Sequence, residues 1–154
     1  MTPILKAVAA TFDSTNMILP LCLSDLEIKD ADYRTRDGEG PSITWLVDHL
    51  LHHRKQIVQL LGGTPAEQPS PEPNLTERWQ QSTRELAAAL ESADDAALAK
   101  PSKAGPHGEK QALDTIVFLA WHEAYHVGMV VAIRKALGYP GAAEVVRARQ
   151  AVAS

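Results

Sequence analysis

The sequence predicts an all-α protein, a four-helix bundle with a short additional helix at its C-terminus. Three observations predict this class. Four long segments place apolar residues at the three- and four-residue spacing of an amphipathic helix. The segments between them are polar and rich in proline and glycine. No part of the sequence shows a convincing strand pattern. Long amphipathic helices joined by polar loops are typical of a bundle, and we expect one of the up-and-down type.

Length and charge limit the classes of protein to consider. With 154 residues, we expect residues 1–154 to form one domain, because the chain is too short for two comfortable ones. The net charge of −4 argues against nucleic acid as a partner, since phosphate binding needs clustered Lys and Arg. Residues 116–137 form the longest apolar segment, but charged residues interrupt it, so we expect no membrane span. The N-terminus lacks a signal-peptide pattern. Cys22, the single cysteine, fits a reducing cytoplasm.

The first helix is expected over residues 4–26, where apolar residues follow a helical stripe. Pro20 lies inside that pattern and lacks a backbone N–H, so we expect a kink near Asn16 or a frayed last turn. Residues 25–41 are rich in aspartate and glycine and show no sustained periodicity. They are expected to form a connecting loop, with at most a short turn of helix.

The second helix is expected over residues 43–61. Ser42 is a candidate N-cap, and two glycines and a proline follow the last turn. Arg54 falls near the centre of the apolar face, where an unpaired charge is costly. Its side chain must therefore either extend to solvent or have an acidic partner.

The third helix is expected over residues 75–92, with Asn74 or Thr76 as its N-cap. Before it, residues 64–74 contain four prolines and form a linker. After it, residues 92–110 are polar and are expected to form a long crossover or lid.

The fourth helix, residues 113–138, is the longest, and Gly138 followed by Pro140 is a typical helix end. A short amphipathic helix is expected over residues 142–152. One stripe of the fourth helix is expected to face the core and consists of Leu119, His122, His126, Met129, Ile133 and Leu137.

Two pairs of histidines lie four residues apart on these helices. His122 and His126 lie on the fourth helix, and His49 and His53 lie at the border of the buried face of the second. Residues four apart share a helix face, so both imidazoles of a pair can reach one divalent ion. Three imidazoles and one open position are typical of a catalytic metal site. Hydrogen-bonded core histidines are the alternative, and the spacing alone favours neither.

The acidic residues near these histidines have simpler explanations. Glu123 follows His122 but points roughly 100° away around the helix, so the run is not interpreted as an H-E-x-x-H protease helix. We expect Glu123 to face solvent or a dimer partner. Asp48 is expected to be a surface acid rather than an acceptor for a ligand N–H.

The aromatic residues are expected mainly to pack. Trp45 and Trp79 are predicted to lie in the core, and Trp121 and Tyr125 are expected to pack rather than to line a substrate mouth. Cys22 is expected to be a small buried residue.

Two segments resemble the DinB/YfiT-like family. The run WHEAYHVGMVVAIRKALG, residues 121–138, is similar to the family's C-terminal motif, an H-x-x-[YH]-H-x-G-type run before a short apolar helix that ends in Leu-Gly. The run PSITWLVDHLLHHRKQIVQLLGG, residues 41–63, resembles its second-helix motif, in which one histidine stands at the position of His49. The order of elements matches over nearly the whole chain.

The resemblance implies a four-helix bundle that binds one divalent metal through His49, His122 and His126. Nickel or zinc is the ion it favours, with iron and manganese as further candidates, and a homodimer is the assembly it implies. The expected function is a cytoplasmic metal-dependent enzyme, a thiol transferase or hydrolase, that activates water or a low-molecular-weight thiol for attack on a small electrophile. One alternative is a non-catalytic, stress-related metal- or ligand-binding bundle in which His53 blocks the fourth position. Another is a metal-free bundle with a structural role.

Overall fold

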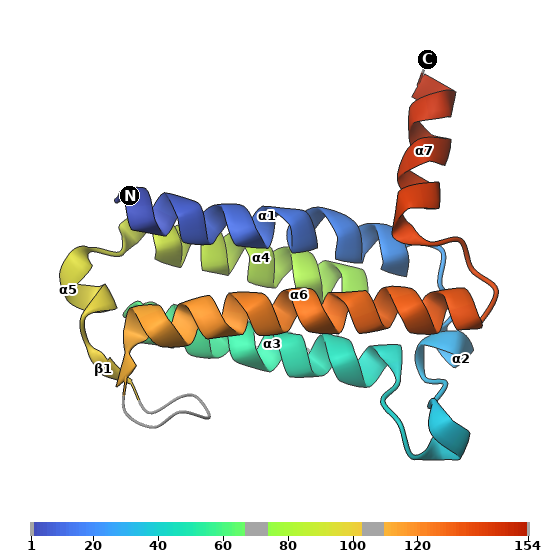
Figure 1. Ribbon diagram of the computed structural model, residues 1–154, viewed down its shortest axis with the longest axis horizontal. Coiled ribbons are helices and arrows are strands. Elements are labelled where there is room, and N and C mark those ends of the chain that lie inside the picture. The colour runs from blue at the N-terminus through green and yellow to red at the C-terminus, as the bar shows by residue number, and fades with distance from the viewer. Residues whose placement is uncertain (1, 67–73, 103–109, 154) are drawn as a thin grey trace.

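The structure is a computed structural model that describes residues 2–66, 74–102 and 110–153. Its described part is mostly helical, which confirms the all-α class. Four long helices lie side by side (Figure 1): α1 (Pro3–Leu23), α3 (Ile43–Leu60), α4 (Leu75–Ser92) and α6 (Ala112–Ala136). The remaining helices are short: α2 (Ile28–Ala31), the 3-10 turn η1 (Arg36–Gly38), α5 (Asp95–Leu98) and the C-terminal α7 (Ala142–Ala153).

The ends of the long helices follow local capping chemistry. Ser42 caps α3, because its Oγ accepts a hydrogen bond from the backbone N–H of Trp45 at 3.1 Å. Asn74 caps α4 in a reciprocal capping box with Glu77. Gly138 follows the end of α6 with φ of +89°, a conformation that side chains rarely adopt. These cap predictions are confirmed.

The four long helices form a closed ring in which α1 and α3 each pack against α4 and α6. At one end of the bundle, Val8 and Ile116 from the first halves of α1 and α6 share an apolar cluster with Ile57 and Leu90 from the second halves of α3 and α4. Helices α1 and α6 are therefore parallel to each other and antiparallel to α3 and α4. The α3–α4 connection joins opposite ends of the bundle, which differs from a simple up-and-down order. The apolar spacing shows where a helix lies in the sequence but not which way it runs in the bundle. A long proline-rich linker between two helices permits a connection that crosses from one end of the bundle to the other.

A buried polar network separates this cluster from a second apolar cluster at the other end of the bundle. The Arg54 guanidinium donates two hydrogen bonds to the Glu123 carboxylate, both at 2.7 Å. It also donates to the Asn16 Oδ1 at 2.6 Å and to the Thr83 Oγ at 2.9 Å, and it lies 3.6 Å from the ring centroid of Trp79. The network thus draws on all four long helices, and Glu123 is the acidic partner that Arg54 requires.

The expectation that Glu123 faces solvent or a dimer partner is wrong. Its side chain is buried, with 2% of the residue exposed, and its carboxylate also accepts a hydrogen bond from the hydroxyl of Thr15. The ion pair with Arg54 explains this burial, because a carboxylate leaves water readily only when it is paired and hydrogen-bonded.

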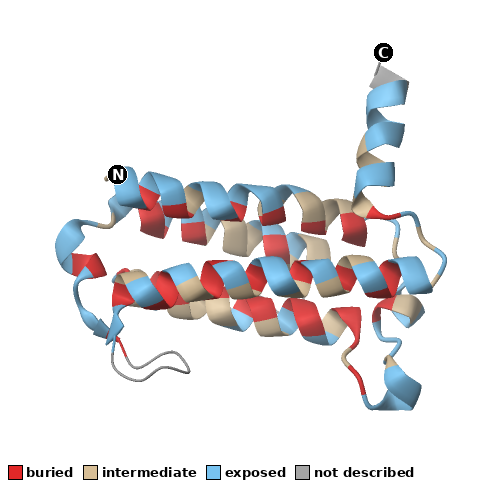
Figure 2. Cartoon of the chain, in the orientation of Figure 1, coloured by how far each residue is buried: buried red, intermediate tan, exposed pale blue. Residues whose placement is uncertain are grey.

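The buried face of α6 is offset from the predicted stripe. Figure 2 shows that buried residues alternate with exposed and intermediate ones along this helix. Leu119 and Ile133 are buried as expected, but His122, His126 and Met129 are only half-buried on the flank of the buried face. The centre of that face runs along Ile116, Ala120, Glu123, Val127 and Val130. Apolar residues surround most of α6, so the periodicity could not locate the centre of its buried face.

Helix α6 is also the one described helix that is long and apolar enough to cross a membrane. In this structure it packs between α1 and α3 and carries the buried charges Glu123 and Arg134.

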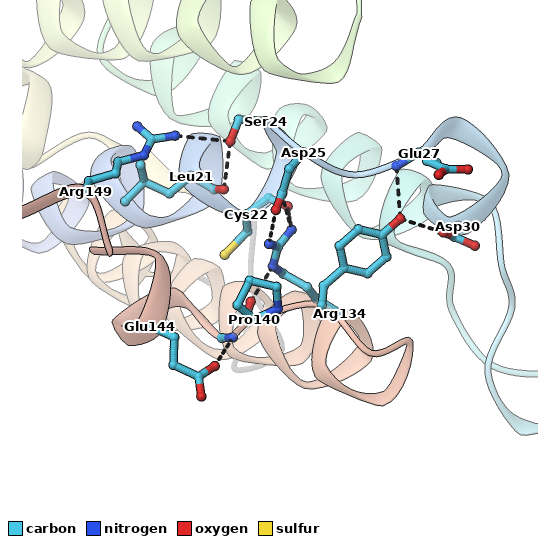
Figure 3. A network of polar contacts seen from close by, with 12 residues as sticks. Leu21, Cys22, Ser24, Asp25, Glu27, Asp30, Arg134, Pro140, Glu144 and Arg149 are labelled. Carbon is cyan, nitrogen blue, oxygen red and sulfur yellow. Dashed lines mark hydrogen bonds and ion pairs between the residues drawn. The ribbon is translucent and has the colours of Figure 1, made fainter. Parts of the chain in front are cut away.

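Arg134 joins the end of α6 to the end of α1 beneath α7 (Figure 3). It is fully buried and donates hydrogen bonds to the backbone carbonyls of Cys22 and Pro140, each at 2.7 Å, and to both carboxylate oxygens of Asp25 at 2.6 and 2.7 Å. Helix α7 follows directly and projects away from the bundle (Figure 1). Cys22 is buried, as predicted.

Three smaller differences concern the connections. Helix α1 ends at Leu23, a few residues earlier than expected, and Pro20 lies within it. The expected crossover contains α5 and a short antiparallel ladder, β1 (Pro101–Ser102) paired with β2 (Lys110–Gln111), whose two-residue strands are too short to leave a sequence pattern. The rest of that crossover, residues 103–109, lies outside the described residues.

Candidate metal centre

Four imidazoles meet between α3 and α6, and we call them the histidine cluster: His49, His53, His122 and His126. The Nε2 atom of His122 lies 3.3 Å from the Nε2 of His49 and 2.9 Å from the Nε2 of His126. The structure therefore brings together the three histidines predicted as ligands. Their role as ligands stays a prediction.

His53 belongs to the same cluster. Its ring lies edge-on to His49 and His122, with centroid separations of 4.5 and 4.8 Å. One ligand nitrogen from each of these three histidines falls within 4.8 Å of the other two. This set of three contains His53 in the place of His126, which the sequence had favoured.

The packing of α3 against α6 positions these rings. His49 lies between buried leucines of α3, so its side chain leaves the helix at the edge of the core. The buried pair Arg54–Glu123 stands one residue beyond His53 and His122, and it fixes the register of α3 against α6 at this level. The histidine cluster and the ion pair thus occupy opposite sides of the same helix turns.

The contacts around His122 fit a shared cation better than hydrogen bonds alone. One imidazole nitrogen carries either one hydrogen or one lone pair, so the Nε2 of His122 cannot form two good hydrogen bonds, to His49 and to His126. Among the described residues, the buried Nδ1 atoms of His122 and His126 have no hydrogen-bond partner, so these two rings lack the outer acceptor that ligand histidines usually have. Nitrogens bound to one tetrahedral zinc at 2.0–2.1 Å would lie about 3.3 Å apart. The observed separations of 3.3 and 2.9 Å are close to that value.

Electrostatics keeps the predicted ligands neutral at pH 7. Burial, followed by the charges of His53 and His122, lowers the pKa of His49 from 6.5 to about 4. Burial, followed by His126 and His53, lowers the pKa of His122 to about 4. Burial also lowers the pKa of His126. Neutral imidazole is the form that binds a metal.

Aromatic side chains border the cluster. Trp45 stacks on His49 with a centroid separation of 5.0 Å and an interplanar angle of 11°. Trp45 is 47% exposed, which corrects its assignment to the core. The sequence could not show this, because its position on the edge of α3 allows either environment. Trp79 is fully buried, as predicted.

On α6, the aromatic residues lie on the outer side of the cluster. The ring of Tyr125 lies edge-on to that of His126, with 5.1 Å between the ring centroids, and stacks on that of Trp121, with 6.0 Å between the centroids. Both aromatic residues are more than half exposed, at 56% and 63%. They are therefore surface residues beside the cluster rather than packing residues of the core.

The nearby acids take no part in the cluster. The carboxylate of Glu123 is turned to Arg54, so the run 122–126 lacks the glutamate base of an H-E-x-x-H site. Asp48 is a surface acid, as expected, and pairs with Arg78 at 2.6 Å. His107 lies outside the described residues.

Gln56 is a polar neighbour of the cluster that the sequence argument missed. Its Oε1 lies 2.9 Å from the Nδ1 of His53, and its Nε2 lies 3.1 Å from the Nε2 of His52. Its position three residues after His53 and four after His52 could have signalled both contacts.

Comparisons with known proteins agree with this fold. The family model of the DinB superfamily matches residues 13–130, a range that includes all four histidines of the cluster. No match is found among curated proteins. The crystal structure of the DinB-like protein YjoA from Bacillus subtilis is similar, with a TM-score of 0.70 and 17% sequence identity over 87% of this chain and 93% of that one. At this identity the likeness shows the fold alone. The family match covers most of the chain, and the chain belongs to the DinB superfamily.

Proposed function

We propose that the protein binds one divalent metal ion through His49, His122 and His126 and uses it to activate a nucleophile. The observation that carries this proposal is the convergence of three Nε2 atoms from two helices, with separations of 3.3 and 2.9 Å about His122. A bound divalent ion lowers the pKa of a coordinated water or thiol, which supplies a nucleophile at neutral pH.

The side chains of the site would bind the ion and orient the histidines that hold it. Half-burial keeps the imidazoles neutral, and the stacking of Trp45 on His49 restricts the rotation of that ring. Imidazole suits zinc and nickel, the two ions we favour, and also iron; manganese is a further candidate. The attack of water or of a low-molecular-weight thiol on a small electrophile rests on the resemblance described above. The reaction would be a hydrolysis or a thiol transfer.

A second candidate function is metal binding without catalysis. The position of His53 favours it, because a fourth imidazole near the ion would occupy the place of a substrate or water. Both candidates share the metal centre, so the presence of metal is the first point to establish.

Elemental analysis of protein purified without an affinity tag or chelator tests the metal centre. We expect about one nickel, zinc, iron or manganese ion per chain and loss of that metal in His126→Ala. His52→Ala, a variant of an exposed neighbouring histidine, should retain it. If wild-type protein neither contains nor takes up metal on titration, the proposal is wrong. If metal is present, hydrolysis and thiol transfer are then screened with that ion loaded.

The proposal also includes a homodimer in the cytoplasm that binds neither nucleic acid nor membrane. Exposed apolar side chains on α6, such as Val117 and Trp121, support an interface there. Sedimentation analysis of the metal-loaded protein would measure the assembly.

A further inference from the structure

Gln56 fixes the orientation of the His53 ring. The Oε1 of Gln56 can only accept, so at 2.9 Å it receives a hydrogen bond from the Nδ1–H of His53. The same amide donates from its Nε2 to the Nε2 of His52 at 3.1 Å. The two contacts require the same orientation of the amide. The Nδ1 of His53 is therefore occupied by Gln56, which leaves its Nε2 as the nitrogen that could bind an ion.

The hydrogen bond from His53 to Gln56 is of the kind that metal-bound histidines make outside the metal site. A ligand imidazole almost always donates its other N–H to an acceptor, which sets both its tautomer and its orientation. Within the described part of the chain, His53 has such an acceptor, whereas the buried Nδ1 atoms of His122 and His126 have no hydrogen-bond partner. His53 is also in ring contact with both His49 and His122.

We propose that His53 is a fourth imidazole ligand of the metal and that Gln56 is the positioning residue that holds it in its ligating form. This inference rests on the metal centre proposed above. Its simpler alternative is that His53 only packs on the cluster while it bonds to Gln56. One ring nitrogen of His53 lies within 4.8 Å of a ring nitrogen of His49 and of His122, and this proximity favours ligation.

If His53 is a ligand, the kind of metal bound decides whether a coordination position stays open for water or a thiol. Four imidazoles complete the shell of an ion that takes four ligands, such as zinc. An ion that accepts more ligands, such as nickel, retains room for water or a thiol. With a fourth imidazole, zinc would therefore leave no open position for a substrate, whereas nickel would leave one.

The test combines metal affinity with a count of the ligands. Wild type, His53→Ala, Gln56→Leu and the matched control His52→Ala are loaded separately with nickel and with zinc. Competition with a chelator gives the affinity, and X-ray absorption gives the number of imidazoles around the ion. We expect Gln56→Leu to weaken binding about 10- to 100-fold. His53→Ala should weaken it further and lower the imidazole count from four to three. His52→Ala removes the second contact of Gln56 but leaves its contact with His53, so it should keep the imidazole count of four and weaken binding less than Gln56→Leu.

The outcomes separate this inference from the function on which it rests. Metal binding by wild type with an unchanged affinity and imidazole count in His53→Ala would overturn the fourth ligand and leave the three-histidine centre intact. Full affinity in Gln56→Leu would overturn the positioning role. No metal binding by wild type would overturn the centre itself. Circular dichroism of the metal-free variants checks that each is folded, so that a lost ligand is not mistaken for a lost fold.

Discussion

Glu123 and His122 are adjacent in sequence but serve opposite sides of α6. The imidazole of His122 joins the histidine cluster, whereas the carboxylate of Glu123 enters the core and pairs with Arg54. From sequence, Glu123 was expected to face solvent or a dimer partner, and only Arg54 was anomalous, as a charge on the apolar face of α3. The structure makes each the partner of the other. Recognising that pairing required the fold, because the two residues lie on different helices.

The ion pair yields a prediction about stability. Glu123→Gln removes the charge and leaves the buried guanidinium of Arg54 without its counter-ion. We expect a loss of about 3–5 kcal/mol in the free energy of unfolding, the usual cost of breaking a buried pair. Urea denaturation measures it. Asp48→Asn breaks an ion pair in which Asp48 is about half exposed, and it should cost less than about 1 kcal/mol. Equal losses in the two variants would contradict the structural role of Glu123.

The histidine cluster predicts a pH dependence in metal-free protein. His49 and His122 have folded pKa values of about 4, against 6.5 in the unfolded chain. Between these values the unfolded chain binds more protons, so the free energy of unfolding falls as the pH drops from 6.5 towards 4. Thermal unfolding in the presence of a chelator, followed from pH 7.5 to 5, should show this decline. Above pH 7 the effect disappears, because both states are neutral.

Variants separate this effect from the titration of other groups. His49→Gln and His122→Gln should each flatten the decline, whereas His52→Gln should leave its slope unchanged. A slope that is the same in all four proteins would mean that the pKa values of the cluster are not lowered.

At the scale of the elements, the sequence predicted where the helices begin and end better than how they are rotated and directed in the bundle. Ser42, Asn74 and Gly138 cap or terminate their helices by local chemistry, and their positions were predictable for that reason. The rotation of α6 and the parallel course of α3 and α4 depend on contacts between helices. The histidine pairs were visible because i, i+4 spacing is local. The contact of His49 with His122 is not local and required the structure, whereas the contacts of Gln56 with His52 and His53 are local and could have been inferred from the spacing.

The end of α6 is held by Arg134, which predicts a local effect on α7. Lysine at this position keeps the charge but cannot reproduce the four hydrogen bonds to Cys22, Asp25 and Pro140. We expect Arg134→Lys to lower the protection of the α7 amides in hydrogen exchange at least about tenfold, while the amides of α3 change less. Arg149→Ala removes an exposed contact to Ser24 and is the matched control. Unchanged protection of α7 in Arg134→Lys would show that the helix is held by other contacts.

At the scale of the whole molecule, polar chemistry is concentrated at the middle of the bundle. Apolar clusters occupy both ends, and the ion pair and the histidine cluster lie between them on opposite sides of α3 and α6. An ion bound there would link the two helices that carry the histidines. Metal binding should therefore stabilise the entire fold.

This linkage gives a prediction for the intact protein. An ion present at about 100 times its Kd adds about 2.7 kcal/mol to the free energy of unfolding. For a protein of this size, that corresponds to a rise of about 5–10 °C in Tm. Nickel or zinc should produce this rise in wild type and in His52→Ala and should fail to do so in His49→Ala. A rise of equal size in His49→Ala would place the bound ion elsewhere.

The location of the ion is the most direct test of the central claim that the histidine cluster is a metal centre. Crystals of protein loaded with one equivalent of nickel or zinc, measured at the absorption edge of that metal, would give its position from anomalous scattering. We expect one peak per chain between α3 and α6, about 2.0–2.1 Å from nitrogens of His49, His122 and His126. A peak bound by other residues, or a cluster that stays empty in metal-loaded crystals, would contradict it.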